Sequence, residues 1–149
     1  MNIKLLYIIA TITFLNSCNN SVEPNFSSIP DPYLRWRAYN ISNYSIEQHH
    51  ICFCSNRGLF AKITVQNNTI TNVINRDTGV PLPPEEWQRY KTIDGLFEII
   101  HSINRDSVAA FMVEYDGKYG YPKSFYVDPN AQIADEEYGY DSNNLMREN

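Results

Sequence analysis

His50, Cys52 and Cys54 are the residues of this chain whose types and spacing could do chemistry. They occupy alternate positions of a predicted strand, where side chains at i, i+2 and i+4 share one face of a sheet. One imidazole and two thiolates are ligands that Zn²⁺ accepts, and His101 or a carboxylate could serve as the fourth. No further Cys-x-x-Cys or His-x-x-His pair supplies that ligand, so a metal site is the weaker alternative.

A disulfide between Cys52 and Cys54 is the interpretation that we favour. An exported chain meets oxidising conditions, and two cysteines remain once Cys18 is set aside. In a regular strand the two Cα atoms would lie ~6.6 Å apart, near the upper limit for a disulfide, so a bulge or twist at Phe53 is expected. Two alternatives remain: reduced cysteines that fill the core, and a thiol oxidoreductase, which usually has Cys-x-x-Cys at a helix N-terminus.

Cys18 is a further residue with predicted chemistry, as a site of lipid attachment. Lys4 precedes an apolar run over residues 5–15, which is too short to span a bilayer and fits a signal peptide over residues 1–17. The sequence LNSC at residues 15–18 is similar to a bacterial lipobox, whose cysteine receives acyl chains such as palmitate. Cys18 would then become the N-terminus of the mature chain.

Other candidate sites are weaker. Tyr119 and Tyr121 lie in a glycine-punctuated loop and could contact a partner, although such tyrosines more often fold back on a sheet. The sequence from Asp128 begins like a calcium loop, but Ile133 replaces its sixth-position Gly and Gly139 its twelfth-position Glu. No Ser, His and acidic residues are spaced so as to indicate a catalytic triad.

The elements that must position these residues follow from hydrophobic periodicity and turn residues. Helices are predicted from Pro32 to about Asn40, with a stripe of Leu34, Ala38 and Ile41 flanked by Trp36 and Tyr39, and over Thr92–Asn104, with a stripe of Leu96, Ile99, Ile100 and Ile103. Strands are predicted over residues 44–54, 60–66, 69–75, 108–115, 123–128 and 137–140. Asn67-Asn68 suits a tight hairpin turn, and a period of two turns Ala61, Ile63 and Val65 inward.

Composition bounds the domain and its partners. A flexible tether rich in Asn, Ser and Pro is expected over residues 18–30, an α+β domain over 31–142 and a disordered tail over 143–149. The formal net charge of the whole chain is −5, from 12 basic and 17 acidic residues. The predicted signal peptide, residues 1–17, holds one basic residue and no acidic one. The chain after residue 17 therefore has 11 basic and 17 acidic residues and a formal charge of −6. Without a cluster of Lys and Arg, nucleic acid is excluded as a partner.

A series of short motifs in a fixed order covers the chain from about Trp36 to Tyr140. The series is Trp36, Tyr44, Cys52-Phe53-Cys54, Thr92-Ile93-Asp94-Gly95-Leu96-Phe97, Tyr115-Asp116, Gly120-Tyr121-Pro122, Asp128 and Asp135-Glu136-Glu137-Tyr138. It resembles a family of small bacterial lipoproteins that is defined only as a domain of unknown function. Its last part is also similar to PepSY-type and β-lactamase-inhibitor-protein-like periplasmic modules, which is a structural analogy. The resemblance implies a location and a fold, and it brings no catalytic residues.

These patterns predict an α+β fold with a single antiparallel β-sheet of five to six strands and two helices packed on one face, in the order α-β-β-β-α-β-β(-β). We expect a lipid-anchored protein of the bacterial cell envelope, with the outer membrane favoured over the inner. It would be a binding or structural module without enzymatic activity or cofactor. Its partners would be the membrane, through the N-terminal lipid, and an envelope protein. The alternative is a thiol redox or metal-binding protein that uses His50, Cys52 and Cys54.

Overall fold

The computed structural model describes residues 23–54 and 59–148. Its elements in chain order, with η for a 3₁₀-helix, are α1 (Pro32–Tyr39), β1 (Tyr44–Cys52), β2 (Phe60–Gln66), β3 (Thr69–Asn75), η1 (Pro84–Arg89), α2 (Ile93–Ser102), η2 (Arg105–Ser107), β4 (Ala110–Tyr115), β5 (Pro122–Asp128) and β6 (Tyr138–Arg147).

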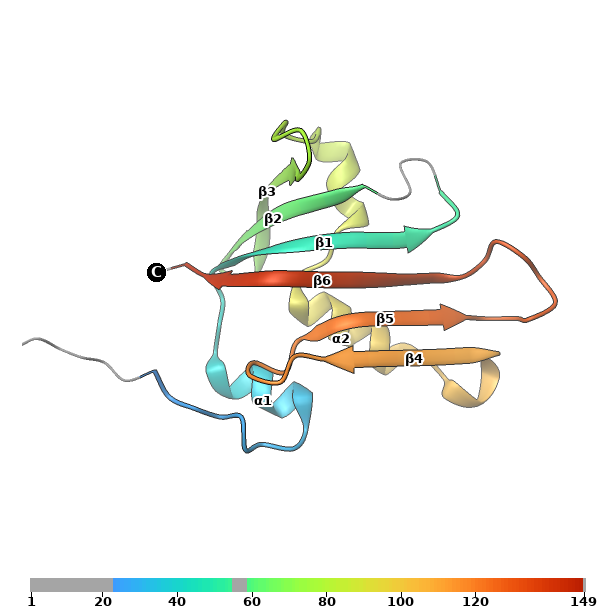
Figure 1. The fold of residues 1–149 in the computed structure, drawn as a ribbon, viewed down its shortest axis with the longest axis horizontal. Coiled ribbons are helices and arrows are strands. Elements are labelled where there is room, and N and C mark those ends of the chain that lie inside the picture. The colour runs from blue at the N-terminus through green and yellow to red at the C-terminus, as the bar shows by residue number, and fades with distance from the viewer. Residues whose placement is uncertain (1–22, 55–58, 149) are drawn as a thin grey trace, which may run out of the picture.

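The strands form one antiparallel six-stranded sheet in the order β3-β2-β1-β6-β5-β4 (Figure 1). The last strand, β6, lies between β1 and β5, and its register with β1 runs from Tyr44 opposite Arg147 to Cys52 opposite Tyr138. The prediction of an α+β fold with a single antiparallel sheet is therefore confirmed.

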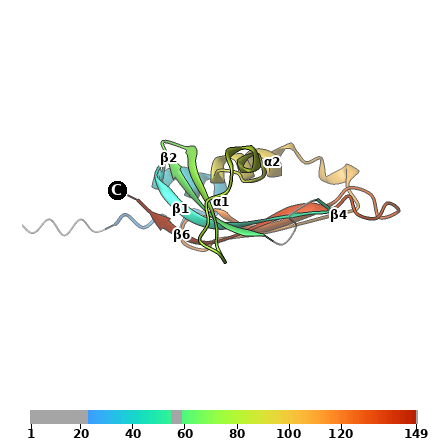
Figure 2. The ribbon, with the colours of Figure 1, turned by 90° about the horizontal axis from the view of Figure 1, so that it is seen from above.

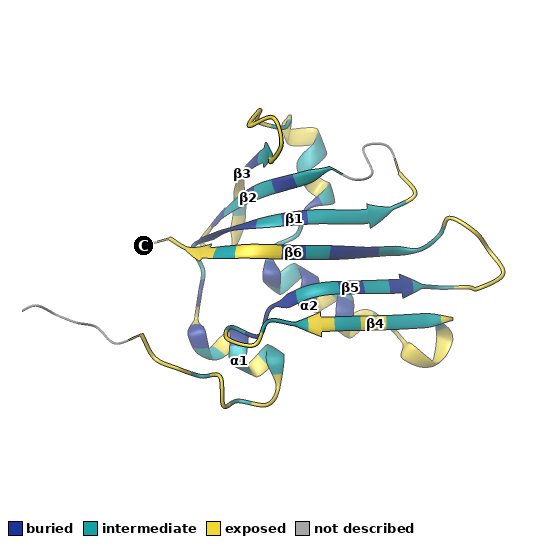
Figure 3. Ribbon diagram, in the orientation of Figure 1, coloured by how far each residue is buried: buried dark blue, intermediate teal, exposed yellow. Residues whose placement is uncertain are grey.

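The core lies between the sheet and α2, which covers one face of it (Figure 2). We call this the helix face. Ala61, Ile63 and Val65 of β2 are all fully buried, as their period of two predicts. Figure 3 shows buried residues along β1, β2, β5 and the first half of β6, whereas the second half of β6 is largely exposed.

Helix α2 begins where the sequence predicts. The Thr92 hydroxyl caps it by accepting a hydrogen bond from Gly95 N–H (3.0 Å). Leu96 and Ile100 are 0% and 2% exposed, which confirms that the apolar stripe faces the core. Within residues 23–54 and 59–148, no helix is long and apolar enough to cross a membrane.

The segment that leads into α2, residues 89–94, is held to the sheet by buried side chains of β1. Gln48 is fully buried; it donates to Lys91 O (3.0 Å) and accepts from Lys91 N–H (2.8 Å). The Tyr44 hydroxyl accepts from Ile93 N–H (2.8 Å). These bonds pair backbone groups that would otherwise be buried without a partner.

Helix α1 buries a different face from the predicted one. Leu34, expected in the apolar stripe, is 58% exposed, whereas Trp36 and Tyr39 are 3% and 5% exposed. The Trp36 ring packs edge-on against Tyr44, with 5.7 Å between centroids. In a helix of eight residues, spacing gives a weak signal, and the larger aromatic side chains bury more area when they face the core.

The prediction of a disordered tail over residues 143–149 is wrong for residues 143–147, which continue β6. Their side chains are mostly polar and exposed, so hydropathy gave no sign of a strand. Backbone pairing with the start of β1 orders them instead: Arg147 lies opposite Tyr44, after an irregularity in register between Ser45 and Glu47.

Candidate functional site

His50, Cys52 and Cys54 come together at the end of β1. A nitrogen of His50 and the two sulfurs all lie within 4.8 Å of one another, and His50 Nδ1 lies 3.5 Å from Cys52 Sγ. The sulfurs are joined in a disulfide, which is the interpretation that the sequence favours. In this oxidised form neither sulfur is a thiolate, so the cluster lacks the ligands that zinc requires.

The disulfide is possible because β1 ends at Cys52, and Cys54 lies beyond it. The two Cα atoms are 5.3 Å apart, closer than the ~6.6 Å of a regular strand and within the usual range for a disulfide. The sequence predicts a bulge or twist at Phe53. In the structure the strand instead ends at Cys52, and the change of backbone direction after it brings Cys54 close to Cys52.

His50 lies in a half-buried, positively charged environment. Its ring stacks on Tyr140, with 4.6 Å between centroids, and the Tyr140 hydroxyl donates to Arg89 O (2.8 Å). Burial lowers the pKa of His50 below its ordinary 6.5, and the charges of Lys91 and Arg89 lower that pKa further. The lowered pKa favours the neutral imidazole, the form that can bind a metal.

Tyr121, one of two tyrosines proposed to contact a partner, is only 6% exposed and belongs to the core. Burial raises its pKa to about 12. The prediction of an exposed recognition site is therefore wrong for Tyr121. Tyr119 is half-buried, and its ring packs edge-on against Tyr39 with 4.9 Å between centroids. Both tyrosines fold back on the domain, as the alternative interpretation holds.

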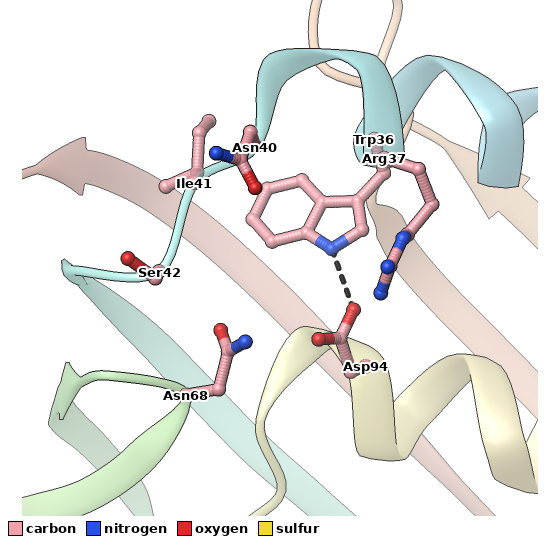
Figure 4. A pocket seen from close by; sticks show the side chains of 7 residues that line it. All are labelled: Trp36, Arg37, Asn40, Ile41, Ser42, Asn68 and Asp94. Carbon is pink, nitrogen blue, oxygen red and sulfur yellow. Dashed lines mark hydrogen bonds between the residues drawn. The ribbon is translucent and has the colours of Figure 1, made fainter.

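A small polar pocket lies between α1, the β2–β3 turn and the start of α2 (Figure 4). Its floor is the hydrogen bond from Trp36 Nε1 to Asp94 Oδ1 (2.8 Å), and Figure 4 shows the Arg37 guanidinium directed toward that carboxylate. The volume is about 60 Å³, far below the several hundred Å³ of sites for organic ligands. The pocket suits ordered water, and its residues tie α1 to α2.

A larger hollow of about 310 Å³ lies on the face of the sheet opposite α2. A row of paired residues crosses β1, β6, β5 and β4 on this face: Ile51, Gly139, Tyr126 and Met112. Gly139 contributes no side chain to this row, and Met112 is 62% exposed. The hollow is open and has apolar walls, and its polar rim includes Asp141. Such a surface can receive a side chain of a partner.

The segment of residues 23–30 was predicted to be part of a flexible tether, and this is wrong. The backbone N–H of Phe26 donates to the Tyr39 hydroxyl (3.2 Å), and the two rings pack edge-on at 5.0 Å. Glu23 pairs with Lys118 (2.9 Å) and with Arg147. The sequence analysis missed this docking, although Phe26 and Glu23 stand out in a polar segment. Cys18, the predicted lipidation site, lies outside the described residues.

A family model described as a family of unknown function (DUF6174) matches residues 33–147. This span covers most of the chain, from the second residue of α1 to the end of β6, and the chain therefore belongs to this family. Comparison with curated proteins and with solved structures finds no match.

Proposed function

We propose that this member of a family of unknown function is a lipid-anchored module of the bacterial cell envelope, attached through Cys18 and placed at the outer rather than the inner membrane. It acts by binding or by supporting an envelope structure, without catalysis. The observation that carries the proposal is the leader: a cation, an apolar run of about 11 residues and then the sequence LNSC at residues 15–18. The likeness to small bacterial lipoproteins and to PepSY-type modules is part of the same proposal.

The structure supports a binding role through the open hollow lined by Ile51, Met112 and Tyr126. Met112 is exposed and Ile51 and Tyr126 are half-buried, so the hollow presents apolar surface to the solvent, as interaction sites do. The nearby titratable pairs join strands to one another: Glu114 with Lys123 (2.8 Å) and His49 with Asp141 (3.5 Å).

The anchor is tested by Cys18→Ser in a bacterial host that lipidates exported proteins. We expect the variant to move from the membrane to the soluble fraction and to lose labelling with a palmitate analogue. The domain should stay folded, because Cys18 precedes the segment that packs on it. A double variant, Cys52→Ser/Cys54→Ser, is the matched control and should stay lipidated and membrane-bound. Membrane association of Cys18→Ser equal to that of the native chain would refute the anchor.

A second candidate function is binding of a soft metal ion by the reduced form of the cluster. It is favoured by one observation, the 4.8 Å limit that encloses the three ligand atoms. A dithiol reductant would supply two electrons and two protons, breaking the Cys52–Cys54 bond and becoming a disulfide itself. Zn²⁺ would then displace both thiol protons and bind the two thiolates together with the neutral imidazole of His50.

Zinc titration of the reduced and the oxidised chain under anaerobic conditions tests this candidate. We expect one equivalent of Zn²⁺ to bind the reduced chain and none to bind the oxidised chain. His50→Ala should weaken binding by at least tenfold. His101→Ala should leave it unchanged, because the His101 ring packs against Tyr33 and Phe97 and lies outside the cluster. Failure of the reduced chain to bind Zn²⁺ would remove the candidate.

A further inference from the structure

The two ends of the sheet are formed by different loops, and the N-terminal segment joins the domain at one of these ends (Figure 1). We call the end at which β6 finishes the anchor end; it holds Glu23, the Asn67-Asn68 turn, the loop of residues 116–121 and Arg147. The opposite, distal end holds the Cys52–Cys54 disulfide and the connection of residues 129–137 between β5 and β6. The register places Tyr44 beside Arg147 and Cys52 beside Tyr138, so β1 runs from one end to the other.

The chain is fastened to the anchor end by a set of contacts that we call the clamp. Glu23 lies between Lys118 (2.9 Å) and Arg147, and it accepts a hydrogen bond from the Tyr119 hydroxyl (3.2 Å). Arg35 Nε donates to Ile29 O (2.9 Å). Exposed ion pairs contribute little individually, but here they act together with the ring contact between Phe26 and Tyr39. The direction in which the chain leaves the domain is therefore fixed at Glu23.

Covalent geometry then limits the distance to the lipid. Glu23 follows Cys18 by five positions. A fully extended chain spans at most ~3.6 Å per residue, so the lipidated cysteine lies within ~18 Å of Glu23. β1 has nine residues, which at ~3.4 Å each separate the two ends by ~30 Å. The anchor end must stay close to the lipid surface, and the distal end need not.

The two ends of the sheet differ in charge, and this difference affects how the domain is oriented on a lipid surface. At the anchor end the charges of Lys118 and Arg147 are balanced by the carboxylates of Glu23, Asp116 and Glu148. The distal hairpin, residues 128–137, has acidic side chains at Asp128, Asp135, Glu136 and Glu137 and no Lys or Arg. An anionic phospholipid surface therefore repels the acidic hairpin more strongly than the anchor end, within a Debye length of ~8–10 Å. Lying flat would bring the acidic hairpin into that layer.

We infer that the anchor end of the sheet lies against the lipid surface and that the distal end, with the Cys52–Cys54 disulfide and the acidic hairpin, points away from it. This inference rests on the proposed lipid attachment at Cys18. The clamp acts as the joint that fixes the orientation of the domain relative to the lipid attachment. The disulfide end is presented ~30 Å above the membrane, where a soluble partner or reductant of the envelope can reach it.

Energy transfer to the bilayer tests the orientation on the full-length lipidated chain. Gln66, at the anchor end, and Ala131, on the distal hairpin, are exposed, and Gln66→Cys and Ala131→Cys each give one site for a donor dye while the native disulfide stays oxidised. Both proteins are reconstituted into vesicles of phosphatidylethanolamine and phosphatidylglycerol that carry a headgroup acceptor. We expect transfer from residue 66 to be several-fold more efficient than from residue 131. Equal or reversed efficiencies would overturn the inference.

Vesicle flotation separates this result from failure of the anchor. A chain that does not float with the vesicles refutes lipid attachment, whereas a chain that floats with equal transfer from both sites refutes only the orientation. Glu23→Lys reverses the charge in the clamp and should narrow the difference between the two sites without abolishing flotation. An unchanged difference in Glu23→Lys would show that the clamp does not set the orientation. Glu148→Lys, one residue beyond the end of β6 at the same end of the sheet, is the matched control and should keep the wild-type difference.

Discussion

Single polar side chains join the helix layer to the sheet at the residue scale. The Tyr44 hydroxyl pairs with the first backbone N–H of α2, at Ile93, and Gln48 pairs with both backbone groups of Lys91. Burial beside Ile93 raises the pKa of Tyr44 far above its ordinary value, so the hydroxyl stays neutral throughout the physiological range. These side chains fix the position at which α2 meets the sheet.

Tyr44→Phe should lower the free energy of unfolding by about 1–3 kcal/mol, because Ile93 N–H would be buried without an acceptor. Urea denaturation followed by circular dichroism measures the change. Tyr126→Phe, on the opposite face of the sheet, is the matched control and should change stability by less than about 0.5 kcal/mol. A Tyr44→Phe variant as stable as the native chain would contradict the role of the hydroxyl.

His50 should make stability depend on pH. Its native pKa lies below the ordinary 6.5, so as the pH falls below 6.5 the unfolded chain binds the proton first and unfolding is favoured. The loss of stability should grow until the pH reaches the lowered native pKa. Urea midpoints measured between about pH 8 and about pH 5 should therefore fall less in His50→Phe, which keeps a ring on Tyr140 and cannot titrate. Equal slopes for the two proteins would contradict this prediction.

At the scale of elements, α2 contributes an apolar face with four buried residues to the core that covers the sheet. Ile93, Leu96, Phe97 and Ile100 are its buried residues, and they pack on the buried rows of β1, β2 and β5. Helix α1 reaches this core through its aromatic residues, and Trp36 donates a hydrogen bond to Asp94 in the first turn of α2. The two α-helices are thus tied together at the point where α2 begins.

Ile100→Ala should destabilise the domain by about 2–5 kcal/mol, through lost burial of apolar area and the cavity left behind. Chemical denaturation gives the free energy directly. Glu98→Ala, an exposed position on the same helix, should change stability by less than about 0.5 kcal/mol. If Ile100→Ala costs no more than Glu98→Ala, α2 does not anchor the core as described.

At the scale of the whole molecule, the clamp links the lipid anchor to the orientation of the domain. Glu23 is exposed, and hydrogen bonds from Lys118 and Arg147 lower its pKa below the ordinary 4.5. The ionised Glu23 carboxylate therefore stabilises the docked segment fully above about pH 4.5. This stabilisation is lost as the pH falls through the lowered pKa that Glu23 has in the folded chain.

We expect the Phe26 amide signal in NMR spectra to move toward its undocked position as the pH falls below about 4. Glu23→Gln removes the titrating carboxyl and should show a weakened clamp already at neutral pH, whereas Glu148→Gln should match the native chain. A Phe26 signal that is insensitive to both pH and Glu23→Gln would mean that Glu23 does not hold the segment.

The sequence by itself determined the features that depend only on residues close together in the chain. Asn67 and Asn68 adopt positive φ angles of 49° and 59° in the predicted hairpin turn, Thr92 caps α2, and β2 alternates as expected. The disulfide followed from the number of cysteines, since Cys52 and Cys54 are the two that remain when Cys18 is set aside. Local backbone preferences and short-range hydrogen bonds suffice for the turn, the cap and the strand.

Only the tertiary structure decided which surfaces are buried and where the chain ends are held. Tyr121 is buried, Trp36 and Tyr39 replace Leu34 in the core, and β6 continues to Arg147. Glu23 meets Lys118 and Arg147 across separations of 95 and 124 residues. Each outcome depends on contacts between residues far apart in the chain, whose energies outweigh local propensity and leave no periodic pattern in the sequence.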